Sequence, residues 1–420
     1  MNLPLLIPVS LMVAFSFSMK RLNKSWLAPP TFFSTLWTFF VIAPICFAPS
    51  FPVHSYGIWV ILLFMIAVGV GSIFGDQYQS KTIVSEMESQ LVAVFQIMPI
   101  ITSILTILSL GGIILLFFFG ISRFSLSNSL IDFLILPNQF SMDRYAGVVV
   151  MPISIRLLMY LLYPASLMGG ITYNQVNNRW LKYFMVLPIV LSIGYAFLLT
   201  TRSTILLSII LWMSGLLSAK VLKNDKVNEM FNVRSVITYL FAIGGFTGIF
   251  ILTAWLRDAG GEIFIDTIVE NVRAYFFGYL SSFTQWVQSY VQNNLLFGIV
   301  TFAGPADLLG LTERQLGFYN EISILGTSHT NIFTALRGVI HDFSILGGFL
   351  FFSFFGFIAT LALNQCRQKK IFWIIPLSAF YAFTIYSPLI SIFNYNSILF
   401  SWILLGGTIF TTPIIKRFVN

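Results

Sequence analysis

The stretch YGIWVILLFMIAVGVGSIFG, residues 56–75, carries no charged side chain and is long enough to cross a membrane as a helix. A spanning helix needs about 20 mostly apolar residues, because backbone in hydrocarbon must form its hydrogen bonds internally. Similar stretches recur along the chain, and the sequence therefore predicts an all-α, polytopic integral membrane protein. The eleven predicted spans are 3–19, 31–48, 56–75, 95–121, 153–172, 183–200, 203–219, 236–256, 343–363, 371–388 and 397–413.

The composition agrees with a membrane protein. Of the 420 residues, 57% are apolar and only 9% are charged, whereas a soluble domain has about 25% charged residues. The two cysteines, Cys46 and Cys366, indicate neither a disulfide framework nor a zinc site. Basic residues follow the first apolar run instead of preceding it, which is the opposite order to a cleavable signal peptide. We predict one membrane domain over residues 1–420.

The distribution of lysine and arginine in the short loops predicts the orientation. With the N-terminus outside the cytoplasm and the C-terminus inside, fifteen of the 23 cations, including every lysine, lie in inner loops. One large loop, residues 257–342, then faces the outside and is too long to be a mere connection. The net charge of +8 is explained by this topology. We therefore expect membrane lipids as partners and no nucleic acid.

The eight cations on the outer side are all arginines, and a guanidinium pairs with phosphate or carboxylate through a planar fork of donors. They either pair with the acidic residues of the outer loops or form a site for an anionic group, and for the whole set we favour the site. They are Arg123, Arg144, Arg156, Arg202, Arg257, Arg273, Arg314 and Arg337.

Arg202 lies in LLTTRSTILLS, residues 198–208, where two predicted spans meet with almost no loop. A charge near hydrocarbon is costly, so an ionisable residue there indicates function and a nearby anion. The alternative is that the side chain extends to the lipid headgroups.

The large outer loop opens with GGEIFIDTIVENVRAYFFGYL, residues 260–280. Acidic residues recur every four positions and apolar residues fill the other face, which predicts an amphipathic helix at the outer membrane surface. Arg273 follows Glu270 by three residues, so an ion pair on the helix surface is the alternative to an anion site there.

The same loop ends with TNIFTALRGVIHDFSILGG, residues 330–348. A helix that begins at Asn331 would place Asn331, Thr334, Arg337, His341 and Asp342 on one polar face. These groups either solvate the helix at the interface or form a site. We favour a site, because an amide, a guanidinium, an imidazole and a carboxylate are combined there.

Motifs for nucleotide or metal cofactors are absent from the sequence. There is no phosphate-binding GxxxxGK[ST] loop, no HExxH and no EF-hand pattern. The three histidines, His54, His329 and His341, are too few to predict a metal site. We expect no cofactor and no metal.

At the TTRS hairpin, the large outer loop and the run 330–348, the chain resembles the Wzy-type O-antigen polymerases, which polymerise oligosaccharide repeat units in bacterial envelopes. That family has a TN-aromatic-T…DFG…G pattern at the loop's end. Here Ile332 stands at the aromatic position and Ser344 replaces the first glycine.

The resemblance implies a metal-independent glycosyltransferase in the bacterial cytoplasmic (inner) membrane, with a periplasmic N-terminus and a cytoplasmic C-terminus. Its substrates would be glycans linked to undecaprenyl diphosphate. A chain-length regulator is a further candidate partner, whose binding the sequence does not show. Arginines can stabilise the leaving diphosphate, and a base would take the proton of the acceptor hydroxyl. We expect Arg202, Arg257, Arg273 and Arg337 to bind the diphosphate, and Asn331 and Thr334 to bind the acceptor.

The candidate bases are His329, Asp342 and Glu321. His329 is our first choice, because histidine has a suitable pKa without tuning. We expect Asp342 to orient Arg337 or the acceptor.

Three alternatives stay open. An O-antigen ligase has a similar architecture but transfers the glycan to the lipid A core. A lipid-linked oligosaccharide flippase or another transporter would place polar groups near the membrane midplane and often has repeated halves, and we find no repeat. A non-catalytic envelope scaffold leaves the all-arginine outer set unexplained.

Overall fold

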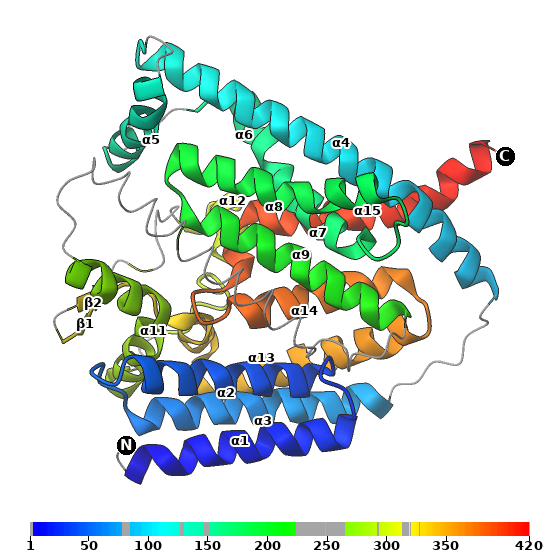
Figure 1. Ribbon diagram of the computed structural model, residues 1–420. Coiled ribbons are helices and arrows are strands. Elements are labelled where there is room, and N and C mark those ends of the chain that lie inside the picture. The colour runs from blue at the N-terminus through cyan, green and yellow to red at the C-terminus, as the bar shows by residue number, and fades with distance from the viewer. Residues whose placement is uncertain are drawn as a thin grey trace. The chain divides into compact units, whose positions relative to one another are not determined.

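The computed structural model describes residues 3–77, 85–126, 130–146, 151–223, 248, 265–291, 294–312, 319, 321–326 and 328–419. Within these residues the chain is almost entirely helical (Figure 1). The described strands, β1 (Ser323–Leu325) and β2 (Ser328–Thr330), pair antiparallel in one hairpin. The predicted all-α, polytopic membrane fold is confirmed.

Among the described residues, eight helical segments are long and apolar enough to cross a membrane, and they correspond to eight predicted spans. They are α1 (Leu3–Asn23), α2 (Pro29–Phe47), α3 (Ser55–Gln77), α4 (Ser85–Arg123), the pair α6 (Ile153–Tyr160) and α7 (Leu162–Thr172), α8 (Arg179–Leu199), α9 (Arg202–Lys223) and α13 (Thr334–Arg367).

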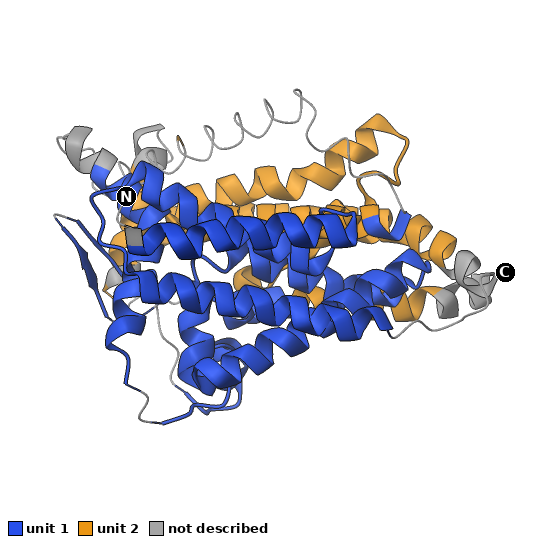
Figure 2. Ribbon diagram, turned by 90° about the horizontal axis from the view of Figure 1, so that it is seen from below, with its two compact units in different colours: residues 1–87, 221–223, 269–399 blue, residues 88–220, 224–268, 400–420 orange. Residues whose placement is uncertain are grey.

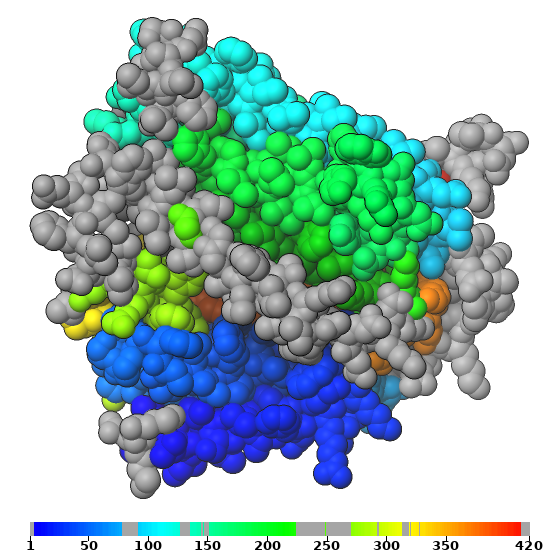
Figure 3. All heavy atoms as spheres, viewed as in Figure 1, coloured from blue at the N-terminus to red at the C-terminus, as the bar shows by residue number. Residues whose placement is uncertain are grey.

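The remaining three predicted spans differ. Span 371–388 consists of η2 (Ile371–Trp373) and a short apolar helix, α14 (Ile374–Tyr386). Span 397–413 is part of α15 (Asn396–Val419), and span 236–256 lies outside the described residues except for Gly248. Large apolar side chains of α1 such as Phe17 and Leu22 are exposed, as expected for contact with lipid. Figure 3 shows α1, in dark blue, at the surface of the molecule.

Contacts divide the chain into two compact units (Figure 2). Unit 1 consists of Met1–Met87, Val221–Lys223 and Val269–Leu399, and unit 2 of Glu88–Lys220, Asn224–Ile268 and Phe400–Asn420. The single domain expected over residues 1–420 stays a prediction.

In unit 1, α3 and α13 run parallel and pack closely through small residues. Gly71 of α3 lies against the carbonyl oxygen of Ser353, and a Cβ at Gly75 would lie 2.8 Å from the carbonyl oxygen of Phe357. Between them Thr360 Oγ1 and Ser72 Oγ are 3.0 Å apart. Small residues spaced four apart let membrane helices approach each other closely, so these glycines determine how α13 is held.

The helix α11 (Ile265–Ser289) packs against the connection between α2 and α3. The Thr284 hydroxyl accepts a hydrogen bond from His54 N at 3.2 Å, and the Tyr279 hydroxyl donates to the Phe40 carbonyl at 2.7 Å. The β hairpin adds Leu325 to a cluster that includes Phe51. The predicted amphipathic helix is therefore present, and the described part of the large loop is folded onto one end of unit 1.

In unit 2, α8 ends at Leu199 and α9 begins at Arg202, which confirms the short hairpin. Thr200 makes the turn in the left-handed conformation, at φ 51°. The predicted span 153–172 is broken at Leu161 because Pro164 has no N–H to donate to the carbonyl of Tyr160.

Candidate functional site

The polar run begins its helix later than predicted. Asn331 precedes α13, which starts at Thr334, so the helix start predicted at Asn331 is wrong. The Ile332 N–H bonds to the Thr330 hydroxyl at 3.3 Å, and the Ala335 N–H bonds to the Ser387 carbonyl at 2.7 Å. These contacts hold the chain in a non-helical path up to Phe333.

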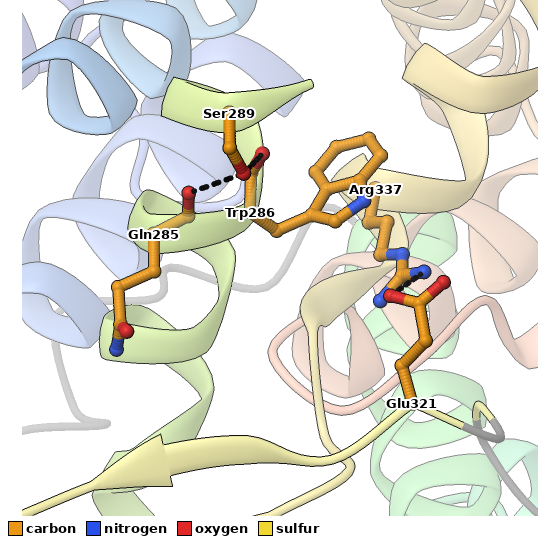
Figure 4. A network of polar contacts seen from close by, with 5 residues as sticks. All are labelled: Gln285, Trp286, Ser289, Glu321 and Arg337. Carbon is orange, nitrogen blue, oxygen red and sulfur yellow. Dashed lines mark hydrogen bonds and ion pairs between the residues drawn. The ribbon is translucent and has the colours of Figure 1, made fainter. Parts of the chain in front are cut away.

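Arg337, in the first turn of α13, is the best-defined feature of the site. Its side chain is buried, with 4% of the residue exposed. The guanidinium carbon lies 4.1 Å from the ring centre of Tyr319, 4.2 Å from Phe333 and 4.9 Å from Trp286. Figure 4 shows the Trp286 side chain extending from α11 alongside Arg337. Aromatic faces attract a guanidinium, more strongly where water is excluded.

The hydrogen bonds of Arg337 are incomplete. Its Nη2 pairs with a Glu321 carboxylate oxygen at 2.8 Å, as Figure 4 shows, and the Glu321 side chain is 66% exposed. Its Nε and Nη1 are buried and have no hydrogen-bond partner among the described residues. A buried donor without a partner costs about 1–3 kcal/mol and calls for an explanation. An oxyanion with several acceptor oxygens would satisfy these donors.

Asp342 is fully buried and fixes a neighbouring loop. Its carboxylate accepts hydrogen bonds from the backbone N–H groups of Val300 at 3.0 Å and Thr301 at 2.6 Å. Its carbonyl accepts a third from Phe297 at 3.1 Å. Both carboxylate oxygens thus hold the 297–301 segment against α13, which favours a positioning role. A role for Asp342 as base stays a prediction.

A break in α13 follows Asp342. Ser344 adopts φ 68° and ψ 178°, a conformation that is nearly restricted to glycine. Its hydroxyl accepts a hydrogen bond from the Gly347 N–H at 3.2 Å and caps the second half of the helix. This is the position at which the polymerase pattern has its first glycine.

Two histidines have different surroundings. His341 follows Arg337 by one turn, and its ring centre lies 5.8 Å from that of Tyr290 and 6.4 Å from that of Trp286. Burial raises the pKa of the Tyr290 hydroxyl, and the charge of Asp342 raises it further. His329 is exposed on β2, opposite Ile324. His341 and Arg337 thus both lie beside Trp286, whereas His329 is exposed on the hairpin, and the geometry favours His341 as the imidazole of the site.

The other predicted residues are distributed as follows. Thr334 is buried and its Oγ1 has no hydrogen-bond partner among the described residues, whereas Asn331 is half-buried. Arg273 is exposed on α11, and Arg257 lies outside the described residues. Arg202 is the first residue of α9 and belongs to unit 2.

Sequence reasoning missed the aromatic residues of the site. Trp286 and Tyr319 lie far from Arg337 along the chain and share no helix with it. Aromatic residues make up 17% of the whole chain, so their presence in the large loop did not single them out. Among the described residues, no group of three or more His, Cys, Asp or Glu side chains is placed to hold a metal ion.

The fold and the site define the class of protein: an all-α, polytopic membrane protein with a buried arginine at one end of unit 1, two of whose nitrogens are unpaired within the described ranges. No family model, no curated protein and no solved structure matches the chain.

Proposed function

We propose that this protein polymerises oligosaccharide repeat units linked to undecaprenyl diphosphate, at the outer face of the bacterial inner membrane. The observation that carries this proposal is Arg337, a buried guanidinium with two nitrogens that have no hydrogen-bond partner among the residues that the structure describes. A guanidinium at an apolar boundary, flanked by aromatic rings, fits the diphosphate of a lipid-linked substrate.

The proposed reaction needs little more than charge stabilisation and a base. The acceptor hydroxyl oxygen attacks the anomeric carbon of the growing glycan and forms the new carbon–oxygen bond. The bond from that carbon to the diphosphate breaks, and its electron pair leaves with the diphosphate, where Arg337 stabilises the charge. The acceptor proton passes to a base, for which His341, His329, Glu321 and Asp342 are the candidates.

The position of the site favours a transferase over a transporter. Transporters bind their substrates near the membrane midplane, between repeated halves. Arg337 instead lies in the first turn of α13, beside the folded part of the large loop. A ligase would use the same chemistry on a different acceptor, so it stays the second candidate.

Deletion of the gene, followed by electrophoresis of the surface polysaccharide, separates the candidates. A polymerase deletion leaves a single repeat unit on the acceptor, and this is the result that we expect. A ligase deletion leaves no repeat unit on the acceptor, and a flippase deletion traps repeat units inside the cell. Wild-type polymer in the deletion strain would reject the proposed function.

A further inference from the structure

Two buried hydroxyl groups near Arg337 have no hydrogen-bond partner in the described part of the chain. They are Thr301 Oγ1 and Thr334 Oγ1, and both residues have 0% exposure. Thr301 belongs to the segment that Asp342 holds against α13. Thr334 precedes Gly338 by four residues, which is about one helical turn. Buried polar groups are almost always paired, so these two hydroxyl groups, close to an arginine whose Nε and Nη1 lack a partner among the described residues, indicate a ligand.

Gly338, the residue after Arg337, separates two hydroxyl groups. A Cβ at this position would lie 3.5 Å from the Tyr319 hydroxyl oxygen and 3.7 Å from Thr301 Oγ1. Its closest neighbour would be Val300 Cγ1, at 3.4 Å. These are ordinary contact distances, so alanine would fit without a clash. Alanine also favours helix more than glycine does, and packing alone therefore gives no reason for glycine here.

We infer that a phosphoryl oxygen binds over the Cα of Gly338 and is held by Arg337, the Thr301 hydroxyl and the Tyr319 hydroxyl. The inference rests on the proposed function for the identity of the ligand, the diphosphate of a lipid-linked glycan. Glycine at position 338 leaves room for one oxygen atom between the two hydroxyls. The site thus combines a cation with neutral donors around one tetrahedral group.

The charges around this position are compatible with an oxyanion. Burial raises the pKa of the Tyr319 hydroxyl above its ordinary value, against the opposing effect of Arg337, so the hydroxyl remains a donor. The Asp342 carboxylate accepts two backbone N–H groups of the 297–301 segment, which stabilise its charge. The remaining carboxylate, that of Glu321, is mostly exposed and can turn into solvent.

Glu321 consequently acts as a built-in competitor of the ligand. It holds Arg337 Nη2, while Nε and Nη1 have no partner in the described part of the chain. Release of Nη2 would complete an edge of two adjacent donors, the geometry in which arginine grips phosphate. Removal of the Glu321 charge should therefore strengthen the binding of diphosphate.

The test uses the full chain purified in detergent, with three probes: inorganic pyrophosphate, undecaprenyl diphosphate and undecaprenol. Binding and thermal melting are measured for the wild type, Gly338→Ala and Gly111→Ala. Gly111 is the matched control, because a Cβ there meets nothing within 4 Å. We expect Gly338→Ala to melt at or above the wild-type temperature without ligand and to bind undecaprenyl diphosphate at least tenfold more weakly. Undecaprenol should bind both proteins equally.

Two further variants keep the test decisive. Thr301→Val preserves the shape of the side chain and should also weaken diphosphate binding, even if Gly338→Ala were to fold poorly. Glu321→Gln should strengthen it severalfold. Loss of pyrophosphate binding in Gly338→Ala would show that the phosphoryl group alone is recognised. If Gly338→Ala binds undecaprenyl diphosphate more weakly but pyrophosphate as well as the wild type does, the site recognises the diphosphate only when it is attached to the lipid. Both results support the inference.

The inference and the proposed function can fail separately. Undiminished binding of undecaprenyl diphosphate to both Gly338→Ala and Thr301→Val would overturn the phosphoryl position, whatever the deletion strain shows. Unchanged surface polymer in the deletion strain would reject the polymerase. Weaker diphosphate binding by Gly338→Ala would then still support an oxyanion site in a protein of another activity.

Discussion

Arg337 combines a permanent charge with a planar guanidinium, which presents a fork of donors and lies against aromatic rings, and an ammonium has neither feature. We predict that Arg337→Lys lowers polymer formation at least tenfold while the protein still inserts and accumulates. An ammonium could still pair with Glu321 but could not present two parallel donors to diphosphate. The measurement is the length distribution of surface polysaccharide at matched protein levels.

Arg123 provides the matched control for this substitution. It pairs with Asp143 at 2.7 Å, and both side chains are about a quarter exposed. Exposed ion pairs contribute about 0–1 kcal/mol, so Arg123→Lys should leave the polymer unchanged. Equal effects of the two lysine variants would mean that Arg337 acts only as a charge or only in folding.

The histidines allow a second prediction at the residue scale. His341→Ala should reduce polymerisation strongly, at least tenfold, whereas His329→Ala should have less than a twofold effect. The reason is position, since His341 lies beside Trp286 and Tyr290 and His329 is exposed on β2. Polymerisation by both variants is measured at matched protein levels. A silent His341→Ala together with an inactive His329→Ala would return the role of base to His329.

How far the site could be predicted depended on whether its residues share a helix. Thr334, Arg337 and His341 recur at helical spacing, so their common face could be read from the sequence. The contacts of Arg337 with Trp286 and Tyr319 depend on how the large loop folds back onto α13. Helical periodicity relates only residues on the same helix, so it could not predict that Trp286 and Tyr319 would contact Arg337.

At the scale of the element, the break in α13 places strain at Ser344. Replacement by glycine removes the side chain that disfavours φ 68°, a conformation that costs about 1–3 kcal/mol. It also removes the cap on the Gly347 N–H and raises the entropy of the unfolded chain, which together cost about 1 kcal/mol. We predict that Ser344→Gly stabilises the protein by about 1 kcal/mol, measured as thermal melting in detergent.

Ser344→Ala is the control for the break in α13. Alanine retains the strained backbone and loses the hydroxyl that accepts the Gly347 N–H. It should therefore destabilise the protein by about 1 kcal/mol. If Ser344→Gly melts below Ser344→Ala, the conformation at this residue is not the source of strain.

The packing of α3 on α13 gives a further prediction. A Cβ at Gly71 would collide with the carbonyl oxygen of Ser353, so the two helices would have to separate. We expect Gly71→Ala to destabilise the protein by about 2 kcal/mol, as overpacking of a close contact does. The fraction that remains monodisperse on heating measures the effect, and Gly111→Ala should show none. A Gly71→Ala protein as stable as wild type would mean that the helices are not in close contact.

Most helices could be predicted from the sequence because an apolar run of sufficient length has few alternatives in a membrane. The departures occur where a specific contact overrides that rule. Pro164 divides the span 153–172 at Leu161, and Ser344 divides α13. The start of α13 was placed too early because the bond from Ala335 N–H to Ser387 joins segments distant in the sequence.

At the scale of the whole molecule, unit 1 has two ends with different chemistry. Because α3 and α13 run parallel, the turn after α13 lies at the same end as the end of α3, where Asn364 donates to Asp76 at 3.0 Å. The turn between α1 and α2, which contains Lys24, belongs to this end as well, since α2 and α3 are antiparallel neighbours. The site around Arg337 lies at the opposite end of unit 1.

This arrangement makes the orientation testable in one experiment. Lysine-rich turns remain on the cytoplasmic side during insertion, so reporter fusions after Lys24 and Lys370 should both read as cytoplasmic. A fusion at Gly310, which follows α12 (Ala303–Leu308) near the site, should read as external. The two lysine positions must agree with each other whatever the orientation, because unit 1 places them at one end. An external signal at both, with a cytoplasmic signal at Gly310, would invert the topology. The Arg337 site would then face the cytoplasm. A polymerase that works at the outer leaflet releases its diphosphate on the other side of the membrane, so the inverted topology would also reject the proposed function.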